Sequence, residues 1–256
     1  MKRSRMPLYT IIGILVFLYL PLLIVMANSF NDSRYGGEWG GFTLKWYNKL
    51  FNDRNVWESF KNTMIIGLST TVVSVIIGIF AAFVLHRFKS YLQTLHSVLI
   101  YIPLAAPDIL LGISMLLFFI SLKIELGMFT IFLAHITFSI SYVTLVLLGR
   151  LQDFDYSVIE AAYDLGATKG QTIRRIFLPM MAPGIIAGGL LTFILSVDDF
   201  VITFFVSGPG SSTLPLYIYS VMRHGSPMTI NALTTIFLIV TFFIVIFSKK
   251  LLEVNK

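Results

Sequence analysis

The chain has 256 residues, of which 56% are hydrophobic and 12% charged, and its mean hydropathy is +0.83. Soluble domains are far less apolar, so the composition indicates an integral membrane protein. The net charge of +6 is scattered through short loops and forms no stripe, which argues against nucleic acid as a partner, and the absence of cysteine excludes disulfides and thiolate sites.

Apolar runs long enough to cross a bilayer as helices recur along the chain. They lie at about 8–28, 63–86, 94–121, 128–149, 182–206 and 231–248. The basic start is followed by a long apolar run without an A-x-A site, which favours a retained first span over a signal peptide. We therefore expect an all-α membrane protein whose single transmembrane domain, residues 1–256, contains six helices in contact with lipid.

The distribution of basic residues indicates the orientation of these helices. With the amino terminus inside, the cytoplasmic segments contain twelve of the nineteen lysines and arginines: Lys2, Arg3, Arg5, Arg87, Lys89, Arg150, Lys169, Arg174, Arg175, Lys249, Lys250 and Lys256. The other seven lie in a longer total length of outer loop. Both termini are therefore expected in the cytoplasm.

Two outer segments are not expected to span the membrane. In 29–62, the stretch "GFTLKWYNKLF" has the spacing of an amphipathic helix at the outer interface. Its Trp46 suits either an aromatic anchor or a functional residue. In 207–230, a Gly/Pro turn precedes a short apolar stretch that could dip back toward the membrane.

The inner loop at 150–181 predicts a helix-turn-helix. A short helix around Glu160 to Leu165 breaks at Gly166, and a second, amphipathic helix passes through Ile176 and stops at Pro179. An apolar stripe with basic edges on such a projection is suited to a partner's groove, although a plain connection between spans is the alternative.

This loop resembles the EAA loop of bacterial ABC importer permeases. The residues in register are Glu160, Ala161, Ala162, Gly166, Ile176, Leu178 and Pro179. The resemblance implies a type I ABC importer permease fold, in which the loop is a coupling helix that docks on an ATPase subunit. The chain has no phosphate-binding loop of its own. We therefore expect a translocation subunit without catalytic residues, metal or cofactor, while ATP and Mg²⁺ bind to the partner ATPase.

Three aspartates fall inside the predicted spans, and no lysine or arginine does: Asp108, Asp198 and Asp199. Such residues are costly in a membrane and indicate function, and the missing partner of opposite charge is best supplied by a cationic substrate. The one basic candidate within the spans is His135.

Helical spacing places Asp198 and Asp199 on different faces of the fifth predicted span. Thr192, Ser196, Asp199 and Thr203 form one polar stripe on a continuous helix, which makes Asp199 the better candidate for lining a path, with Asp198 at its edge or facing a partner permease. Bonds between helices would explain the hydroxyl groups but not the carboxylates.

Asp108 follows Pro103 and Pro107, which interrupt the third span and free backbone carbonyls. Carbonyls freed at membrane depth suit a cation. A proline kink that serves packing alone is the alternative.

Beyond the loop, nearly the whole chain resembles the second permease of spermidine/putrescine importers, the PotC type. The resemblance is carried by "APDILLGIS", "HITFSISYV" and "LSVDDFVITFFVSGPGSSTLPLYIYS" among other segments. It implies polyamine uptake across the bacterial plasma membrane by two different permeases, two ATPase subunits and an extracytoplasmic binding protein. The matching substrate-path positions are Trp46, Asp108, Ser196, Asp198 and Asp199. One departure is Thr229, where a glutamate is usual.

Three alternatives remain open at this stage. The importer could carry a ferric ion, a sugar or an oxyanion, although anions would call for basic residues in the membrane. An ion-coupled secondary transporter could use the aspartates as a relay, but the EAA loop argues against it. A structural membrane anchor would leave the aspartates unexplained.

Overall fold

The computed structural model describes the chain except residues 1–5, 35–36, 88–90, 225–226 and 255–256. All its regular elements in the described part are helices, apart from one isolated bridge between Asn31 and Phe42. The chain divides into two compact units, with residues 1–57 and 217–256 in unit 1 and residues 58–216 in unit 2. The single transmembrane domain stays a prediction.

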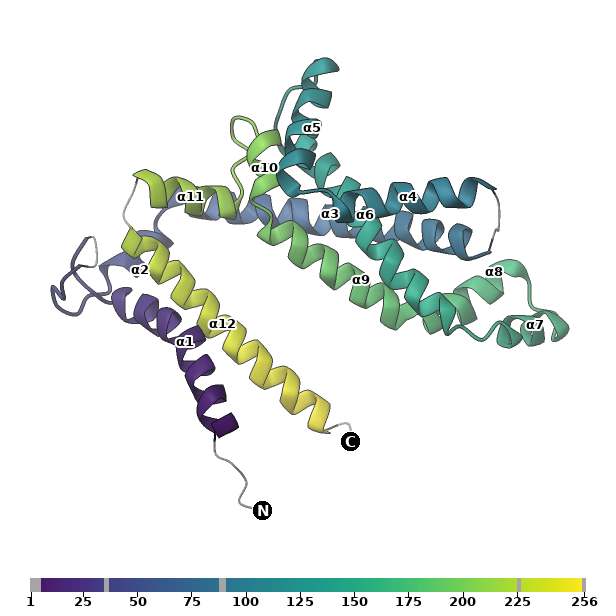
Figure 1. The fold of residues 1–256 in the computed structure, drawn as a ribbon, viewed down its shortest axis with the longest axis horizontal. Coiled ribbons are helices and arrows are strands. Elements are labelled where there is room, and N and C mark those ends of the chain that lie inside the picture. The colour runs from purple at the N-terminus through teal and green to yellow at the C-terminus, as the bar shows by residue number, and fades with distance from the viewer. Residues whose placement is uncertain (1–5, 35–36, 88–90, 225–226, 255–256) are drawn as a thin grey trace. The chain divides into compact units, whose positions relative to one another are not determined.

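Unit 1 is built on two long apolar helices, α1 (Met6–Asn28) and α12 (Pro227–Val254), which lie side by side (Figure 1). The short helix α2 (Lys45–Phe51) also packs on α12. Most of α11 (Leu214–His224) belongs to this unit as well. Most apolar side chains of α1 are exposed, as expected of a helix that contacts lipid or another subunit.

Helix α2 is fixed by the buried side chains of Trp46 and Leu50. The Trp46 indole Nε1–H donates to the Asn31 carbonyl oxygen over 2.7 Å, and the Tyr47 and Ser29 hydroxyls lie 2.6 Å apart. The predicted amphipathic helix is therefore present, and its buried face ties the segment after α1 to α2.

Unit 2 begins with the long helix α3, whose first residues precede the unit boundary, and continues with eight shorter helical segments. The elements are α3 (Arg54–Arg87), α4 (Tyr91–Ala105), α5 (Asp108–Ser121), α6 (Met128–Gln152), α7 (Ser157–Asp164), α8 (Lys169–Thr172), the π-helix η1 (Ile173–Phe177), α9 (Leu178–Asp198) and α10 (Val201–Val206). Helix α6 packs along α9, while α10 packs on α5 and α6 (Figure 1).

Small residues let α3 and α9 approach α6 closely. A Cβ atom at Gly78 of α3 would lie 2.5 Å from Val143 Cγ1 of α6, and one at Gly188 of α9 would lie 3.5 Å from the same atom. Gly184 meets Leu147 and Arg150 one turn further along, so α6 and α9 run antiparallel. Such close helix contacts hold bundles together where the lipid competes with apolar packing.

The number of membrane spans is resolved in part. Four described helices are long and apolar enough to cross a membrane: Tyr9–Asn28, Arg54–Arg87, Met128–Gln152 and Lys169–Asp198. The pair Leu95–Ala105 and Asp108–Ser121 meets the same test together but is bent by 110°, and α12 has a shorter apolar stretch, Met228–Phe243. The predicted all-α fold is thus confirmed, with four or five candidate spans among the described residues, while the six spans and the cytoplasmic termini stay predictions.

Much of the evidence for orientation falls on side chains outside the described part of the chain. These are Lys2, Arg3, Arg5, Lys89, Lys249, Lys250 and Lys256.

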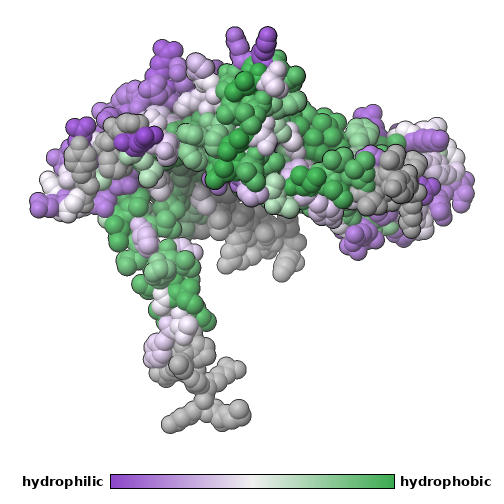
Figure 2. Space-filling view, turned by 45° about the horizontal axis from the view of Figure 1, so that its top comes forward, coloured by the Kyte–Doolittle hydropathy of each residue, from purple (hydrophilic) through white to green (hydrophobic). Residues whose placement is uncertain are grey.

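Large apolar side chains are exposed in both units, as the green areas of Figure 2 show. Phe17 of α1 is 79% exposed and Phe80 of α3 is 68% exposed. Exposed apolar surface on this scale is expected of a protein that lipid and partner subunits cover.

The contact of the two glycines with Val143 gives a matched test of helix packing. Gly78→Ala forces a Cβ atom against a stiff, β-branched side chain and should destabilise the protein by about 1–3 kcal/mol through overpacking. Gly188→Ala meets the same valine at an ordinary distance and should be tolerated. Thermal unfolding in detergent measures both; equal melting temperatures would show that the contact between α3 and α6 is not tight.

Candidate functional site

The first element of the site is a sharp break between α4 and α5. Helix α4 ends at Ala105, and Pro107 precedes Asp108, the first residue of α5, with extended backbone angles of −60° and 136°. Proline disfavours a helical conformation at the residue before it, so Ala106 cannot continue α4. The predicted interruption by proline is present. The angle of 110° between α4 and α5 is larger than that of a kinked but continuous helix.

The second element is a break between α9 and α10. The sequence predicts one continuous helix over 182–206, but α9 ends at Asp198 and α10 begins at Val201. Asp199 has extended backbone angles, and its carboxylate accepts hydrogen bonds from the backbone N–H groups of Ile202 and Thr203, at 3.4 and 2.8 Å. A carboxylate that satisfies the free N–H groups at the start of a helix stabilises the break.

A buried histidine holds the second break against α6. His135 Nε2 lies 3.2 Å from Asp199 Oδ2 and 2.9 Å from Thr203 Oγ1, and Nδ1 lies 2.7 Å from Ser196 Oγ. The Thr203 hydroxyl donates to Asp199 Oδ2 over 2.7 Å, so it accepts from the ring. An imidazole that carries its proton on Nε2 and accepts the Ser196 hydroxyl at Nδ1 satisfies every group.

Three members of the predicted polar stripe, Ser196, Asp199 and Thr203, are therefore brought together on His135, but across a broken helix. The fourth, Thr192, is buried and its hydroxyl has no hydrogen bond among the described residues. The spacing did not indicate that Asp199 has partners within the chain, His135 and Thr203. The Asp199 side chain is 10% exposed and that of His135 is 1% exposed. Leaving either group buried without the other would be costly, so this pair is a structural element of the site.

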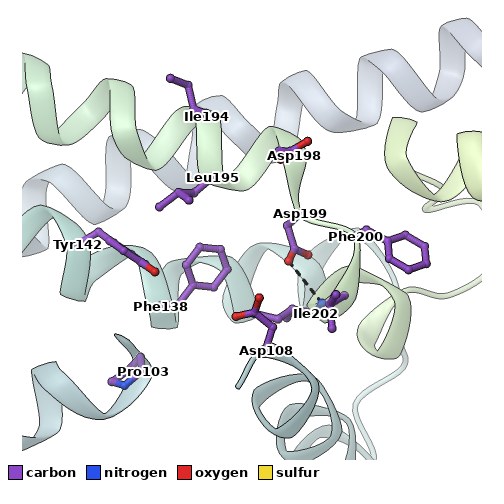
Figure 3. A pocket seen from close by; sticks show the side chains of 11 residues that line it. Pro103, Asp108, Phe138, Tyr142, Ile194, Leu195, Asp198, Asp199, Phe200 and Ile202 are labelled. Carbon is purple, nitrogen blue, oxygen red and sulfur yellow. Dashed lines mark hydrogen bonds between the residues drawn. The ribbon is translucent and has the colours of Figure 1, made fainter. Parts of the chain in front are cut away.

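Both breaks line one open pocket of about 270 Å³ within unit 2 (Figure 3). Figure 3 shows the carboxylates of Asp108, Asp198 and Asp199 around it. The remaining lining residues are aromatic or aliphatic: Pro103, Phe138, Tyr142, Ile194, Leu195, Phe200, Val201 and Ile202. Lysine and arginine are absent from this lining, so the pocket has the charge of a cation site.

Two of the three carboxylates are open to a ligand. Asp108 and Asp198 are exposed, and neither side chain has a hydrogen bond or ion pair among the described residues. Asp198 is the last residue of α9, where the negative end of the helix dipole and the free carbonyls add to its own charge. A bound cation would offset the repulsion between the Asp198 carboxylate and the negative end of the helix.

The other two predicted substrate-path residues lie elsewhere. Ser196 is buried against His135 and does not line the pocket. Trp46 belongs to unit 1, where it is 6% exposed and the Lys45 ammonium lies 4.7 Å from its ring centroid. The aromatic residues of the pocket, such as Phe138 and Tyr142, were not predicted; both lie on the expected span 128–149, but nothing in their spacing distinguishes them from lipid-facing residues.

The predicted coupling loop forms a second candidate site. Helix α7 ends in a glycine turn in which the Gly166 N–H donates to the Tyr163 carbonyl and the Ala167 N–H donates to the Ala162 carbonyl, both over 2.9 Å. Gly166 has a φ of +81°, which a residue with a side chain adopts only with strain. The predicted break at Gly166 is thus present and requires a glycine.

The beginning of each loop helix is also capped. Asp155 accepts a hydrogen bond from the backbone N–H of Ser157 over 2.9 Å, and bonds from the Ser157 hydroxyl and N–H lower the pKa of the Asp155 carboxyl. Thr168 and Gln171 bond reciprocally to each other's backbone at the start of α8. The loop is therefore a defined helix-turn-helix.

The predicted stop at Pro179 is wrong, because the second loop helix continues into the membrane helix. Segments α8, η1 and α9 follow one another without interruption from Lys169 to Asp198. Proline removes an N–H group from the helical ladder, and the wide turn of η1 just before Pro179 accommodates that loss by shifting the bonding register.

The EAA-type residues differ in their exposure. Glu160, Ala161, Gly166 and Pro179 are exposed, Ala162 is buried, and Ile176 and Leu178 are half-buried. Leu165, beside the glycine turn, is 88% exposed. An exposed apolar side chain at the tip of an ordered helical turn suits contact with another protein.

A helical membrane protein with broken helices around an acidic pocket and an ordered helix-turn-helix loop belongs to the class of transport components rather than enzymes. Comparison with known protein families supports this class. Residues 74–253 match the family described as "binding-protein-dependent transport system inner membrane component". The chain is a member of this family.

Individual relatives extend over most of the chain. It is 37% identical to the spermidine/putrescine transport system permease protein PotC of Escherichia coli K12, over 93% of this chain and 90% of that protein. It is 41% identical to the putrescine transport system permease protein PotI of the same bacterium, over 87% and 82%. A PotC homolog of Mycoplasma pneumoniae is 34% identical over 89% and 84%.

Solved structures support the fold. A chain of a bacterial alginate ABC transporter, crystallised with an alginate pentasaccharide-bound periplasmic protein, aligns with a TM-score of 0.71 over 94% of this chain and 90% of its own length, at 19% identity. A chain of the inward-facing MetNI methionine ABC transporter aligns with a TM-score of 0.59 over 79% and 95%, at 20% identity. At these identities the similarity concerns the fold, which is that of ABC importer permeases.

The His135 contacts predict a measurable loss of stability. His135→Ala leaves the Ser196 hydroxyl and the Asp199 carboxylate without their shared partner, and should cost about 1–3 kcal/mol or more. Thr137→Ala is the control, because its exposed hydroxyl bonds only to the Leu133 carbonyl of the same helix. If thermal unfolding in detergent gave both variants the wild-type melting temperature, the network would not hold the break.

Proposed function

We propose that this chain is one of two different permease subunits of a bacterial plasma-membrane importer of polyamines. In this proposal it is a type I permease with six spans and both termini in the cytoplasm. Two ATPase subunits bind ATP and Mg²⁺, and an extracytoplasmic binding protein delivers the substrate. The family, the importer-permease fold and the transport of spermidine and putrescine by the PotC and PotI systems support the assignment.

The observation that carries the polyamine assignment is the acidic pocket at the two helix breaks. Asp108 and Asp198 project from different helices, α5 and α9, and neither has a partner among the described residues. A polyamine is a flexible chain with two or more ammonium groups, so separate carboxylates can bind its charges in turn. Phe138, Tyr142 and Phe200 add aromatic surface for the ammonium and methylene groups.

The carboxylates have different functions in this proposal. Asp198 and Asp108 contact ammonium groups directly. Asp199 is held by His135, stabilises the helix break, and adds its negative charge to the pocket. Ser196 orients His135 from α9. Trp46 contacts the substrate elsewhere on its path, and the position of the Lys45 ammonium, 4.7 Å from the ring centroid, supports a cation–π role for the indole.

The coupling step uses the loop at 150–181. Closure of the ATPase subunits on ATP moves α7 through contacts with Glu160, Ala161 and the turn at Gly166. The motion passes through Ile176, Leu178 and Pro179 into α9, since η1 and α9 form one uninterrupted helical path. Ala162 is buried within the loop, so its packing passes the movement of α7 to the rest of the loop.

Removal of the Asp198 charge tests the substrate site. Asp198→Asn should raise the spermidine concentration for half-maximal uptake about tenfold, since one charge-assisted contact contributes about 1.5–3 kcal/mol. Labelled spermidine uptake in cells that carry the whole transporter measures this, with complex assembly and ATPase activity checked in parallel. Glu125→Gln, an exposed acid outside the pocket, is the control.

Asp199→Asn separates the two functions of the acidic residues. Because Asp199 is bound by His135 and Thr203, its loss should lower stability as well as uptake. Normal uptake in both the Asp198 and the Asp199 variants would exclude this pocket from the substrate path.

Gly166 tests the coupling loop. Gly166→Ala places a side chain at positive φ and should cost about 1 kcal/mol at the end of α7, so that ATP hydrolysis is less tightly linked to uptake. Gly170→Ala introduces the same methyl group into open space without positive φ. The ratio of ATP hydrolysed to spermidine imported should rise only in the first variant, and an unchanged ratio would remove the coupling assignment.

A further inference from the structure

A cluster of aromatic side chains joins the base of the loop to two membrane helices. It consists of Phe83 and His86 from α3, Phe154 and Tyr156 from the segment before α7, and Phe177 from η1, and we name it the aromatic bracket. Phe154 contacts the Tyr156 ring at a centroid distance of 5.0 Å and the Phe177 ring at 5.5 Å. Phe83 meets Phe177 edge to face at 5.9 Å.

The polar contact of the bracket links Tyr156 to His86. The Tyr156 hydroxyl lies 2.9 Å from His86 Nδ1, and the two rings are nearly parallel, at 12°, with centroids 5.6 Å apart. Burial raises the pKa of Tyr156, with Arg87 acting in the opposite direction, so the hydroxyl keeps its proton at neutral pH and can donate to the imidazole. This bond spans 70 residues of the chain.

The hydrogen bond between Tyr156 and His86 connects the start of α7 to the end of α3. Tyr156 immediately precedes α7, and its carbonyl accepts the N–H groups of Ile159 and Glu160 in the first turn of that helix. His86 lies in the last turn of α3. The start of α7 is therefore fixed to α3 as well as to α6, which precedes it in the chain.

The apolar packing beneath the bracket connects the same helices. Phe177 is buried in a cluster with Ala82 of α3, Val143 and Leu147 of α6, and Met181 of α9. Ile159 of α7 packs against this cluster. A displacement of α7 therefore acts on three membrane helices through packed contacts, and not only through the covalent path into α9.

We propose that Tyr156 and His86 are positioning residues that clamp α7 to α3, so that a force applied to the loop moves α3, α6 and α9 together. The proposal rests on the proposed function, in which an ATPase subunit acts on α7. Without the clamp, α7 would tilt on its own and part of the ATPase motion would not reach the membrane helices.

The test removes the hydrogen bond but keeps the rings. Tyr156→Phe, His86→Phe and the double variant are prepared in the assembled transporter, and hydrogen exchange is measured for the backbone amides of 159–165. Each single variant should speed exchange about fivefold, since one hydrogen bond contributes about 1 kcal/mol. The double variant should be no faster than either single one, because both remove the same bond.

A second measurement separates positioning from general stability. The ratio of ATP hydrolysed to substrate imported should rise in all three variants, while the melting temperature of the membrane domain should change little. Tyr101→Phe is the matched control, because this exposed tyrosine of α4 has no hydrogen bond among the described residues. Its exchange and coupling ratio should equal those of the wild type.

The two readouts distinguish failure of this proposal from failure of the proposed function. If wild type imports no polyamine but the variants speed exchange in α7 without additivity and raise ATP hydrolysis in the absence of transport, the clamp stands and the polyamine assignment fails. If wild type imports polyamine but exchange is unchanged, or the two single effects add, the clamp is overturned. Faster exchange with an unchanged coupling ratio would also overturn it, because the bond would then stabilise α7 without transmitting motion.

Discussion

The hydrogen bonds of His135 fix the geometry on which the acidic pocket depends. A broken helix at membrane depth exposes backbone groups that no water satisfies, and a buried carboxylate adds its own cost. Asp199 meets both costs at once, since it caps α10 and binds His135 and Thr203. The break can therefore persist, and Asp198 is left at the end of α9, open to the pocket.

The two helix breaks differ in their causes but meet at one place. The break before α5 follows from Pro107, whose ring disfavours helix at the preceding residue, whereas the break after α9 has no proline and is held by side-chain bonds. Helix α10 packs on α5, which brings the breaks together around the pocket. Under the proposed function, this convergence lets carboxylates from two helices bind successive charges of one chain.

The sequence predicted which polar side chains lie together better than it predicted where the helices end. Residue spacing grouped Ser196 and Asp199, and the scarcity of basic residues singled out His135, because an ionisable side chain in an apolar run is conspicuous. The end of α9 at Asp198 could not be predicted, since the apolar run continues and the break depends on contacts with α6. Pro179 misled because its effect depends on the π-helical turn before it, which has no clear sequence signal. Gly166 was predictable because a positive φ selects glycine locally.

The loop and the pocket are connected by a single helix. From Leu178 to Asp198, α9 has 21 residues and therefore a length of about 30 Å, and it begins directly after η1. Along this length it is packed on α6 through Gly184 and Gly188, and near its end Ser196 binds His135. Under the proposed function, helices α6 and α9 move with the loop as one body that carries Asp198, while Asp108 lies on α5 across the first break. A motion of that body relative to α5 would then change the distance between the two carboxylates, and with it the affinity for a polycation.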